Sequence, residues 1–471
     1  MSIPTYDRGA LTPGVVHVSV GYFHRSHQAV YLDDLARLGN TDWGLVGVGL
    51  RRREMRDALV PQDCLYTVVE RGGEGDRARI VGSMGRYLFA PDDNRAVVHA
   101  LADERAKLVT LTVTGAAYHA DPATGEFDAD DEEVTADLAD PSGPRSALGM
   151  LVEALDVRRR AGRPPLTILS CDNLPANGDI TRTAVTSFAR LRDPSLARWI
   201  ADNVAFPSSM VDRITPKTTT ADRDWVADEF GVDDRWPVMT EPFSQWVIED
   251  AFCNDRPPLD EVGVRFVADV RPYALMKTRL LNGTHCALGF LGVLAGLRRT
   301  DEAMADPVFG AYVARLMADE VAPLLPRVAG FDVPSYRRSV IARLSNPKIG
   351  DQLARLCRGG SLKLPRHVVP SIEAARRAGL PHPLLTLAVA GWVRHARGVD
   401  EAGRTFAIDD PAADDLRALA RDPRRLVATL GALGDDPAFA GEVEAALRGF
   451  ERRGVQATVA AALGPTERIA A

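Results

Sequence analysis

The sequence predicts an α/β protein in which an open, mostly parallel sheet domain is followed by a mostly α-helical C-terminal domain. Two observations support this order. In the first half, runs of β-branched and other apolar residues alternate with helical patterns, which is typical of parallel βαβ units. In the second half, apolar residues recur at helical spacing between Pro and Gly breaks. At 471 residues, the chain is long enough for two or three packed domains.

The sheet domain is expected over residues 1–272. Its strands are predicted at GVVHVSV (14–20), WGLVGVGL (43–50), KLVTLTVT (107–114) and PLTILSCDN (165–173). Helices ending in AVYLDDLARL and ALGMLVEALDVRRR precede the second and the fourth of these strands. The further runs WPVMT and VGVRFVADV are expected to carry the sheet to about residue 270.

The helical domain is expected over residues 273–471. Its helical segments include FGAYVARLMADEVAPLL, YRRSVIARL, LLTLAVAGWVRHARG and DLRALARDPRRLVATLGALG. The boundary falls beside MKTRLLNGTH (276–285), which places Lys277, Asn282 and His285 in an otherwise apolar segment. Clefts at the edge of open sheets commonly bind ligands, so this segment is a candidate site.

Composition excludes several classes of partner. The formal net charge of −7 gives no basic field for a nucleic acid or an anionic membrane, and no uncharged run is long enough to cross a bilayer. The N-terminus has no apolar segment of the kind that signal peptides carry. The five cysteines contain no CxxC pair. We therefore expect a cytoplasmic protein with no nucleic-acid or membrane partner and no bound metal.

A dinucleotide site is indicated at the end of the first strand. A Rossmann-type fingerprint needs glycines at three positions, which Ser19, Gly21 and His24 occupy here. Only Gly21 fits, and it allows the backbone to approach a pyrophosphate closely. Taken alone, one glycine after a strand is also an ordinary turn residue.

The end of the second strand bears on the choice between NAD and NADP. An acid at this place binds the adenosine ribose of NAD, whereas an Arg accommodates the extra phosphate of NADP. The strand runs into Arg51, Arg52 and Arg53, so NADP is favoured and NAD is not excluded. The alternative is a solvated run of charges that opens a helix.

Several long motifs together resemble those of one family, the mannitol 2-dehydrogenase family of polyol-specific long-chain dehydrogenases and reductases, which also includes fructuronate and tagaturonate reductases. The motifs are FHRSHQAVY (23–31), SCDNLPANG (170–178), MVDRITP (210–216), EPFSQWVIED (241–250), K-x4-N-x2-H (277–285), SNPKIGDQLARLC (345–357) and SLKLPR (361–366). The resemblance spans nearly the whole chain. It implies a Rossmann-type domain followed by a helical domain that carries the catalytic residues.

The resemblance also implies roles for individual residues. Lys277 would be the general acid/base, with no metal involved, and burial in LMKTRLL would lower its pKa toward the working pH. Asn173 and Asn282 would hold the substrate oxygen, and His285 would orient the same region. The residues implied in binding are Asp212, Arg355 and Lys363 for the substrate, and Gly21, Tyr22, Phe23, Arg52 and Arg53 for NAD(P)(H).

Each of these residues also has an ordinary structural interpretation. Asp212 beside Arg213 is typical of an ion pair, and Arg355 and Lys363 are typical of surface charges. Cys171 follows a buried strand, but no activating base stands near it in the sequence, so we do not expect a nucleophile.

Two expectations concern the geometry near Lys277. On a straight helix, His285 would lie roughly 80° around and about 12 Å along from Lys277. We therefore expect Lys277 at or just before the first helical turn, with the substrate bridging it to Asn282 and His285. Two acids that the family usually carries are replaced by Ala274 and Gly115, which leaves the route of the proton to water open.

The sequence favours a monomeric enzyme that interconverts a sugar alcohol and its 2-ketose, of the mannitol/fructose or arabinitol/xylulose type. A hexuronate reductase is the alternative, because Arg358 or Lys348 supplies a cation for an anionic substrate. A catalytically idle dinucleotide-binding redox sensor is a remote alternative. An intact Lys277, Asn282 and His285 argues against the sensor, which needs no base.

Overall fold

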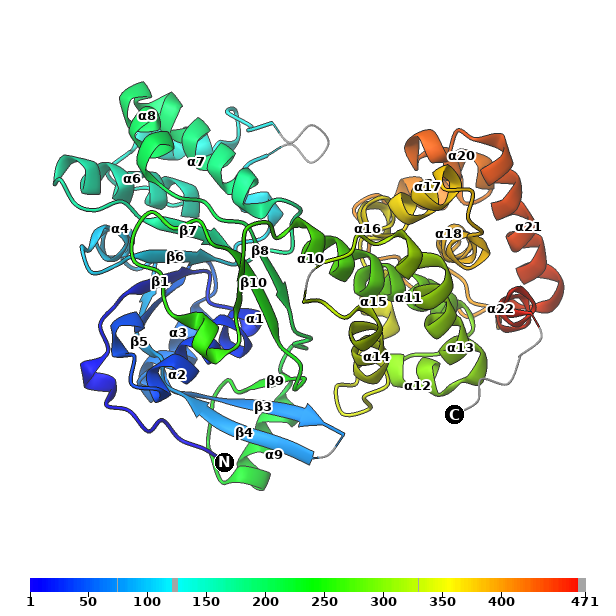
Figure 1. Ribbon diagram of the computed structural model, residues 1–471, viewed down its shortest axis with the longest axis horizontal. Coiled ribbons are helices and arrows are strands. Elements are labelled where there is room, and N and C mark those ends of the chain that lie inside the picture. Colours follow the sequence, from blue (N-terminus) through cyan, green and yellow to red (C-terminus); the bar gives the residue numbers. More distant parts are fainter. Residues whose placement is uncertain (74, 121–125, 329, 465–471) are drawn as a thin grey trace. The chain divides into compact units, whose positions relative to one another are not determined.

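The computed structural model describes residues 1–73, 75–120, 126–328 and 330–464. The chain forms two compact units, Met1–Arg271 and Pro272–Ala471. Figure 1 draws the first unit in blue to green and the second in green to red. No helix in the described ranges is long and apolar enough to cross a membrane.

The first unit is built on a five-stranded sheet in which all neighbouring strands are parallel. Its strands, in spatial order, are β5 (Met84–Phe89), β2 (Leu45–Gly49), β1 (Val15–Val18), β6 (Leu108–Leu111) and β7 (Thr167–Ser170). The strand order reverses between β1 and β6, which is the Rossmann-type switch point. The predicted fold class is confirmed.

Alternating side chains of the strands bury both faces of this sheet. Val16 and Val18 of β1 belong to a core shared with α4, α6, α7 and α8, whereas Val15 belongs to a second core shared with α2 and α3. Figure 1 shows α6, α7 and α8 on one side of the strands and α2 and α3 on the other. Both faces are therefore covered, as parallel sheets require.

The helices of this unit follow the predicted alternation with strands. They are α1 (Tyr22–Ser26), α2 (Gln28–Arg37), α3 (Arg53–Leu59), α4 (Asn94–Ala102), α5 (Glu132–Ala139), α6 (Ala147–Arg160), α7 (Asn177–Arg192), α8 (Pro194–Asn203) and α9 (Thr220–Phe230).

The expectation that WPVMT and VGVRFVADV extend the main sheet is wrong. They contribute to two separate three-stranded sheets, whose members are β4 (Gly75–Val81), β3 (Tyr66–Gly72) and β9 (Val238–Thr240), and β11 (Arg265–Val267), β10 (Gln245–Glu249) and β8 (Ser209–Asp212). β-branched and aromatic content indicates that a segment is a strand, but it does not specify the pairing partner.

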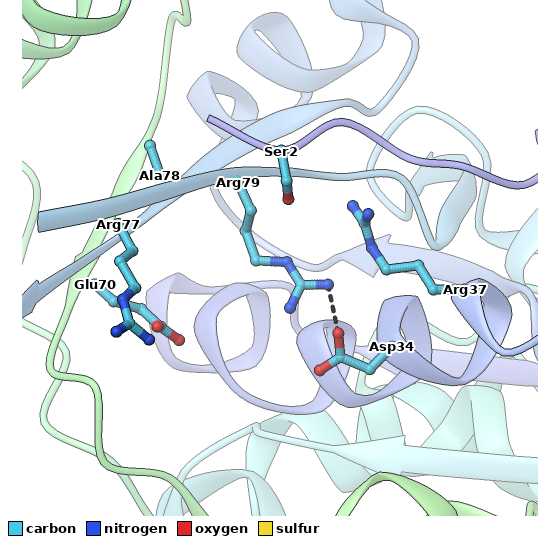
Figure 2. Close-up of a pocket in the computed structure, with 7 residues that line it drawn as sticks. All are labelled: Ser2, Asp34, Arg37, Glu70, Arg77, Ala78 and Arg79. Carbon is cyan, nitrogen blue, oxygen red and sulfur yellow. Dashed lines mark ion pairs between the residues drawn. The ribbon is translucent and has the colours of Figure 1, made fainter.

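A small charged cavity of about 340 Å³ lies where β4 meets the N-terminal segment and α2. Figure 2 shows Arg79 of β4 directed at Asp34 of α2, and the two pair at 2.7 Å. The buried Asp33 also accepts from Arg37 Nε at 2.7 Å and from the Gly82 amide at 2.9 Å. These charges pair with one another, so they fix β4 and the N-terminal segment to α2.

The second unit is helical in its described part. A helix, α10 (Arg271–Met276), leads into it. The remaining helices are α11 (Gly283–Leu294), α12 (Thr300–Ala305), α13 (Pro307–Arg315), α14 (Val333–Leu344), α15 (Leu353–Cys357), α16 (Gly360–His367), α17 (Val369–Arg377), α18 (Pro383–His395), α19 (Ala413–Leu419), α20 (Pro423–Ala428), α21 (Pro437–Arg453) and α22 (Val455–Leu463).

The central helix of this unit is α11, which packs on α15, α16 and α18. Its glycines permit the close approach of α15, because a Cβ on Gly289 would lie 2.9 Å from the Cβ of Leu356. A rigid, buried α11 therefore follows directly after the segment that contains Lys277.

Candidate active site

The residues predicted to act on the substrate and cofactor are divided between the two units. The first unit contains Gly21, Tyr22, Phe23, Arg52, Arg53, Asn173 and Asp212, and the second contains Lys277, Asn282, His285, Arg355 and Lys363. The first unit also has a cavity of about 920 Å³, lined by residues that follow β1, β2, β5 and β6. This carboxyl edge is where open parallel sheets bind their ligands.

The turn after β1 forms one wall of the cavity. Gly21 and Tyr22 line it, whereas Phe23 does not and instead stacks its ring on His27 at a centroid distance of 4.8 Å. Ser19 stands at the first glycine position of the fingerprint and adopts the left-handed φ of 77° that a glycine would take there. A Cβ on Gly21 would have no neighbour closer than 3.9 Å, so the space above it is open.

The segment FHRSHQ (23–28), which follows this turn, packs against β1. His24, Arg25 and His27 are fully buried, and His24 stacks on His17 with ring centroids 3.4 Å apart. Burial lowers the pKa of His17 to about 3 and that of His24 well below its usual value. Both imidazoles are therefore neutral packing groups at physiological pH.

The three arginines that follow β2 differ in their ion pairs and in whether they line the cavity. Arg51 pairs with Glu133 at 2.9 Å, and Arg53 pairs with Asp92 at 2.8 Å. Arg53 is not among the residues that line the cavity. Arg52 does line it and forms no ion pair with any residue in the described ranges.

Asn173 follows β7 at the same edge of the sheet. The neighbouring Asp172 is held by three donors, the amides of Val113 at 3.1 Å and Thr114 at 2.9 Å and the Tyr118 hydroxyl at 2.7 Å. This carboxylate fixes the loops after β6 and β7 to each other, and with them the position of Asn173. Burial raises the pKa of the Cys171 thiol above its usual range, so Cys171 is not an activated nucleophile.

Asp212 ends β8 and is 3% exposed. The neighbouring Arg213 pairs with Glu70 at 2.5 Å and donates to the Glu241 carbonyl at 2.9 Å. Arg213 is thus a structural residue that ties β8 to β3.

Lys277 begins a π-helical turn, Lys277–Asn282, that joins α10 to α11. The prediction that Lys277 lies at or before the first helical turn is wrong, because α10 begins six residues earlier at Arg271. In an α-helix, Lys277 and Asn282 would point about 140° apart. A π-turn closes its hydrogen bond from i to i+5 and so takes more residues per turn than an α-helix, which brings the directions of the two side chains closer together.

Lys277 is only 9% exposed. The Asn282 amide nitrogen is buried and has no hydrogen-bond partner within the described ranges. The segment therefore presents a buried amine and a buried amide donor from one π-turn, with His285 in the first turn of α11.

Helix α16 brings Lys363 and His367 to this segment. A Cβ on Gly283 would lie 3.0 Å from the His367 carbonyl oxygen, so α16 touches the backbone directly after the π-turn. Burial lowers the pKa of His367 to about 4, and the charges of Lys277 and Lys363 add to the effect. Burial also lowers the pKa of Lys363.

Arg355 lies on α15 and pairs with Asp351 through Nε at 2.6 Å. Its side chain is 47% exposed, so one edge of the guanidinium is accessible.

Sequence reasoning missed several residues that line the cavity of the first unit or lie beside Lys277 in the second. Tyr87, His119 and Trp236 line the cavity of the first unit, and His367 lies beside Lys277 in the second. The buried hydroxyls of Tyr22 and Tyr87 have no hydrogen-bond partner in the described ranges. Tyr87, His119, Trp236 and His367 stand outside the motifs that the sequence analysis singled out, so only the folded chain reveals them.

Within the described ranges, no group of three or more His, Cys, Asp or Glu side chains is placed to hold a metal ion. The five cysteines are free thiols.

Comparison with known families decides how the cavity of the first unit and the residues around Lys277 in the second unit are interpreted. Residues 13–261 match the mannitol dehydrogenase Rossmann domain, and residues 269–448 match the mannitol dehydrogenase C-terminal domain. The chain belongs to the mannitol dehydrogenase family.

Curated members of the mannitol dehydrogenase family match the chain over nearly its full length. It is 44% identical to a mannitol 2-dehydrogenase of Phaeosphaeria nodorum, over 98% of this chain and 83% of the relative. It is 43% identical to a mannitol 2-dehydrogenase of Neosartorya fischeri, over 98% of this chain and 95% of the relative.

Two solved structures of mannitol and sorbitol dehydrogenases are also similar. The Pseudomonas fluorescens mannitol 2-dehydrogenase, solved as a ternary complex with NAD and D-mannitol, has a TM-score of 0.89 and 41% identity, covering 98% of this chain and 97% of that one. A D-sorbitol dehydrogenase in substrate-free form has a TM-score of 0.91 and 34% identity, covering 97% of both chains. The predicted family and enzyme class, a polyol dehydrogenase with a Rossmann-type NAD-binding fold, are confirmed.

Proposed function

We propose that this member of the mannitol dehydrogenase family interconverts a sugar alcohol and its 2-ketose with NAD(P)(H), and that Lys277 is the general acid/base. The observation that carries the proposal is the burial of Lys277 in a π-turn that also contains Asn282. π-turns of this kind occur frequently at functional sites. Burial in general disfavours the charged form of an amine, which is the property that a general base working near neutral pH needs.

The proposed cofactor fits the first unit. The cavity lies at the switch point of a parallel sheet, and the open space above Gly21 lets a pyrophosphate approach the backbone. Gly21, Tyr22 and Arg52 are the predicted residues that would hold the dinucleotide. A bound nicotinamide would supply the chemistry of hydride transfer to and from the carbinol carbon.

The remaining chemistry belongs to the chain's own side chains. We assign to Lys277 Nζ the removal of the hydroxyl proton during oxidation, and its return during reduction of the ketose. Asn173 and Asn282 would donate hydrogen bonds to the same oxygen, because neutral amides stabilise developing negative charge without protonating the base. His285 would orient the substrate.

Asp212, Arg355 and Lys363 are proposed to bind the other hydroxyls of the substrate. A polyhydroxylated chain needs acceptors as well as donors, and a carboxylate, a guanidinium and an amine supply both. The exposed edge of Arg355 remains available although Asp351 holds the other.

A hexuronate is the second candidate substrate, and it would need a cation for its carboxylate. Arg358 was a candidate for this role, but it is 65% exposed and pairs with Asp409 at 2.6 Å. Neutralisation of Arg358 by Asp409 leaves Lys348 as the other candidate cation and weighs toward a neutral sugar alcohol. The buried Lys277 likewise favours catalysis over a redox sensor. We also propose that the enzyme is a monomer and is located in the cytoplasm.

Turnover with a small panel of substrates tests the proposal. Purified protein is mixed with NADH or NADPH and with fructose, xylulose, fructuronate or tagaturonate, while nicotinamide absorbance is followed. We expect oxidation of the cofactor with a 2-ketose and little with a uronate. Turnover only with the uronates would favour the hexuronate reductase, and no turnover with any substrate would contradict an enzyme of this class.

A further inference from the structure

We propose that His367 is a proton relay, which takes the alcohol proton on from Lys277 and passes it to solvent. The inference rests on the proposed function, in which Lys277 removes that proton from the substrate. Lys277 is buried, so its amine has little direct access to water. In this scheme His367 does not touch the substrate; it acts through Lys277.

The segment that contains Lys277 supplies no proton carrier of its own. Residues 271–282, which form α10 and the π-turn, contain no Asp, Glu or His. Besides Lys277 they offer Tyr273 and two arginines, none of which accepts a proton near neutral pH. His285 follows in the first turn of α11, where we assign it to the substrate. A relay must therefore come from a neighbouring element.

Helix α16 packs on the π-turn and ends at His367. The contact is close at the backbone, because a Cβ on Gly283 would lie 3.0 Å from the His367 carbonyl oxygen. The charge of Lys277 acts on the His367 ring, and the other charges of the described residues that act on it belong to Lys363 and Arg366 of the same helix. Lys277 and His367 are therefore neighbours across this contact.

The two nitrogens of the His367 ring lie in different surroundings. Nδ1 is buried and has no hydrogen-bond partner within the described ranges, which is unusual for a polar atom inside a protein. Nε2 is not enclosed in this way, and the residue as a whole is half-buried. Burial and the neighbouring cations lower the pKa of His367 to about 4, so the ring is neutral at physiological pH and can accept a proton at Nδ1.

The transfer balances as follows for oxidation of the alcohol. Lys277 Nζ takes the hydroxyl proton and becomes an aminium ion. The aminium gives one proton to His367 Nδ1, directly or through one water, and the ring then releases its Nε2 proton to solvent. Lys277 is a neutral amine again, and exchange of the ring protons with water restores the first tautomer. Reduction of the ketose uses the same path in reverse.

Rescue by imidazole tests the relay. His367→Ala leaves space for a small base, whereas His367→Asn keeps a hydrogen-bonding amide but cannot carry a proton. Loss of a general base costs on the order of 10² to 10⁴ in rate, and water replaces a relay in part, so we expect kcat for polyol oxidation to fall about tenfold in both variants, with KM and NAD(P)H binding changed less than about twofold. Added imidazole should restore the rate of His367→Ala in proportion to its concentration and leave the wild type unchanged. His99→Asn, which replaces an exposed imidazole of α4, is the control and should be fully active.

Titration of the histidine rings by NMR tests the pairing without turnover. Lys277→Met removes the positive charge beside His367, so the pKa of His367 should rise toward its ordinary value. Arg271→Met is the control, because Arg271 is exposed and pairs with Asp269 at 2.8 Å, and it should leave the pKa of His367 unchanged. An unchanged pKa in Lys277→Met would show that the two groups are too far apart for proton transfer, and would overturn the relay.

The kinetic outcomes separate the relay from the proposed function. Wild-type kcat in His367→Asn, or a loss in His367→Ala that imidazole does not restore, would overturn the relay while the activity of the wild-type enzyme upheld the proposed function. A wild-type enzyme that oxidised no polyol would contradict the proposed function itself, and the relay with it.

Discussion

Asp172 is the residue whose replacement should affect both folding and catalysis. Its carboxylate accepts hydrogen bonds from two backbone amides and from the Tyr118 hydroxyl. Asp172→Asn keeps one oxygen and turns the other acceptor into a donor that faces an N–H group. A buried hydrogen bond to a charged group is worth about 1.5–3 kcal/mol, and relief of carboxylate burial offsets part of the loss. We expect the free energy of unfolding to fall by about 2 kcal/mol.

The functional cost should come from the two loops that Asp172 joins. Thr114 has a left-handed φ of 73° and lines the cofactor cavity, and Asn173 is the next residue along the chain. Once the bond to Thr114 is lost, both loops can move. Misplacement of groups around a reacting centre lowers kcat, and we expect a loss of about tenfold or more in kcat/KM for ketose reduction.

Urea unfolding and steady-state kinetics measure the two effects. Asp422→Asn is the control, because Asp422 is an exposed N-cap of α20 at which Asn serves as well as Asp, so its unfolding midpoint and activity should not change. If Asp172→Asn unfolded at the wild-type midpoint and kept the wild-type kcat/KM, Asp172 would not be what fixes these loops.

Three further predictions follow from the same structure. Asp33→Asn should lower the free energy of unfolding by about 3 kcal/mol, because the fully buried Asp33 carboxylate pairs with both Arg37 and Arg79, and Arg37 would lose its only carboxylate partner among the described residues. Asp34→Asn should cost less, because Asp34 is half-exposed and Arg79 keeps Asp33. Although burial opposes it, the hydrogen bonds and charges around Asp33 lower the pKa of its carboxyl below the unfolded value of 3.8. The contribution of Asp33 to the free energy of unfolding is therefore present above pH 3.8 and is lost as the pH falls through the folded pKa. Acid-unfolding curves of wild type and variant measure this loss. Ketose reduction with NADPH should lose more from Arg52→Ala than reduction with NADH, and an equal loss would refute a 2′-phosphate contact. Treatment with EDTA should leave turnover unchanged, since we assign proton transfer to Lys277, and a loss that zinc restores would contradict that assignment.

The sequence was sufficient to predict four of the five strands of the main sheet and the order of the two parts of the chain, but not the edge strand β5. Runs such as Val15–Val18 and Leu45–Gly49 contain β-branched residues and are buried on both faces of the sheet, so their composition alone predicts strands. The hairpin of β3 and β4 was not predicted, because Gly72, Gly75 and Asp76 near its turn are residue types that strands usually lack. The separate small sheets were missed because pairing partners depend on the whole fold.

The candidate site was predictable only where motifs mark it. The motif K-x4-N-x2-H predicts roles for Lys277 and Asn282, yet the π-turn that contains both has no sequence signature. His367 and Tyr87 lie outside any motif and join their groups only through tertiary packing. Likewise, the sequence shows three consecutive arginines but not that Arg52 alone of the three lacks an ion pair among the described residues.

The most direct test of the central claim is the rate of polyol oxidation by Lys277→Ala, measured together with NAD(P)H binding as a check that the fold is intact. Lys107→Ala is the matched control, because Lys107 pairs with Asp255 just before β6 begins. Removal of a general base typically costs on the order of 10² to 10⁴ in rate. We expect a loss of that size in Lys277→Ala, with cofactor binding retained and Lys107→Ala fully active. Near-wild-type oxidation by Lys277→Ala at neutral pH would contradict the assignment of Lys277 as the base.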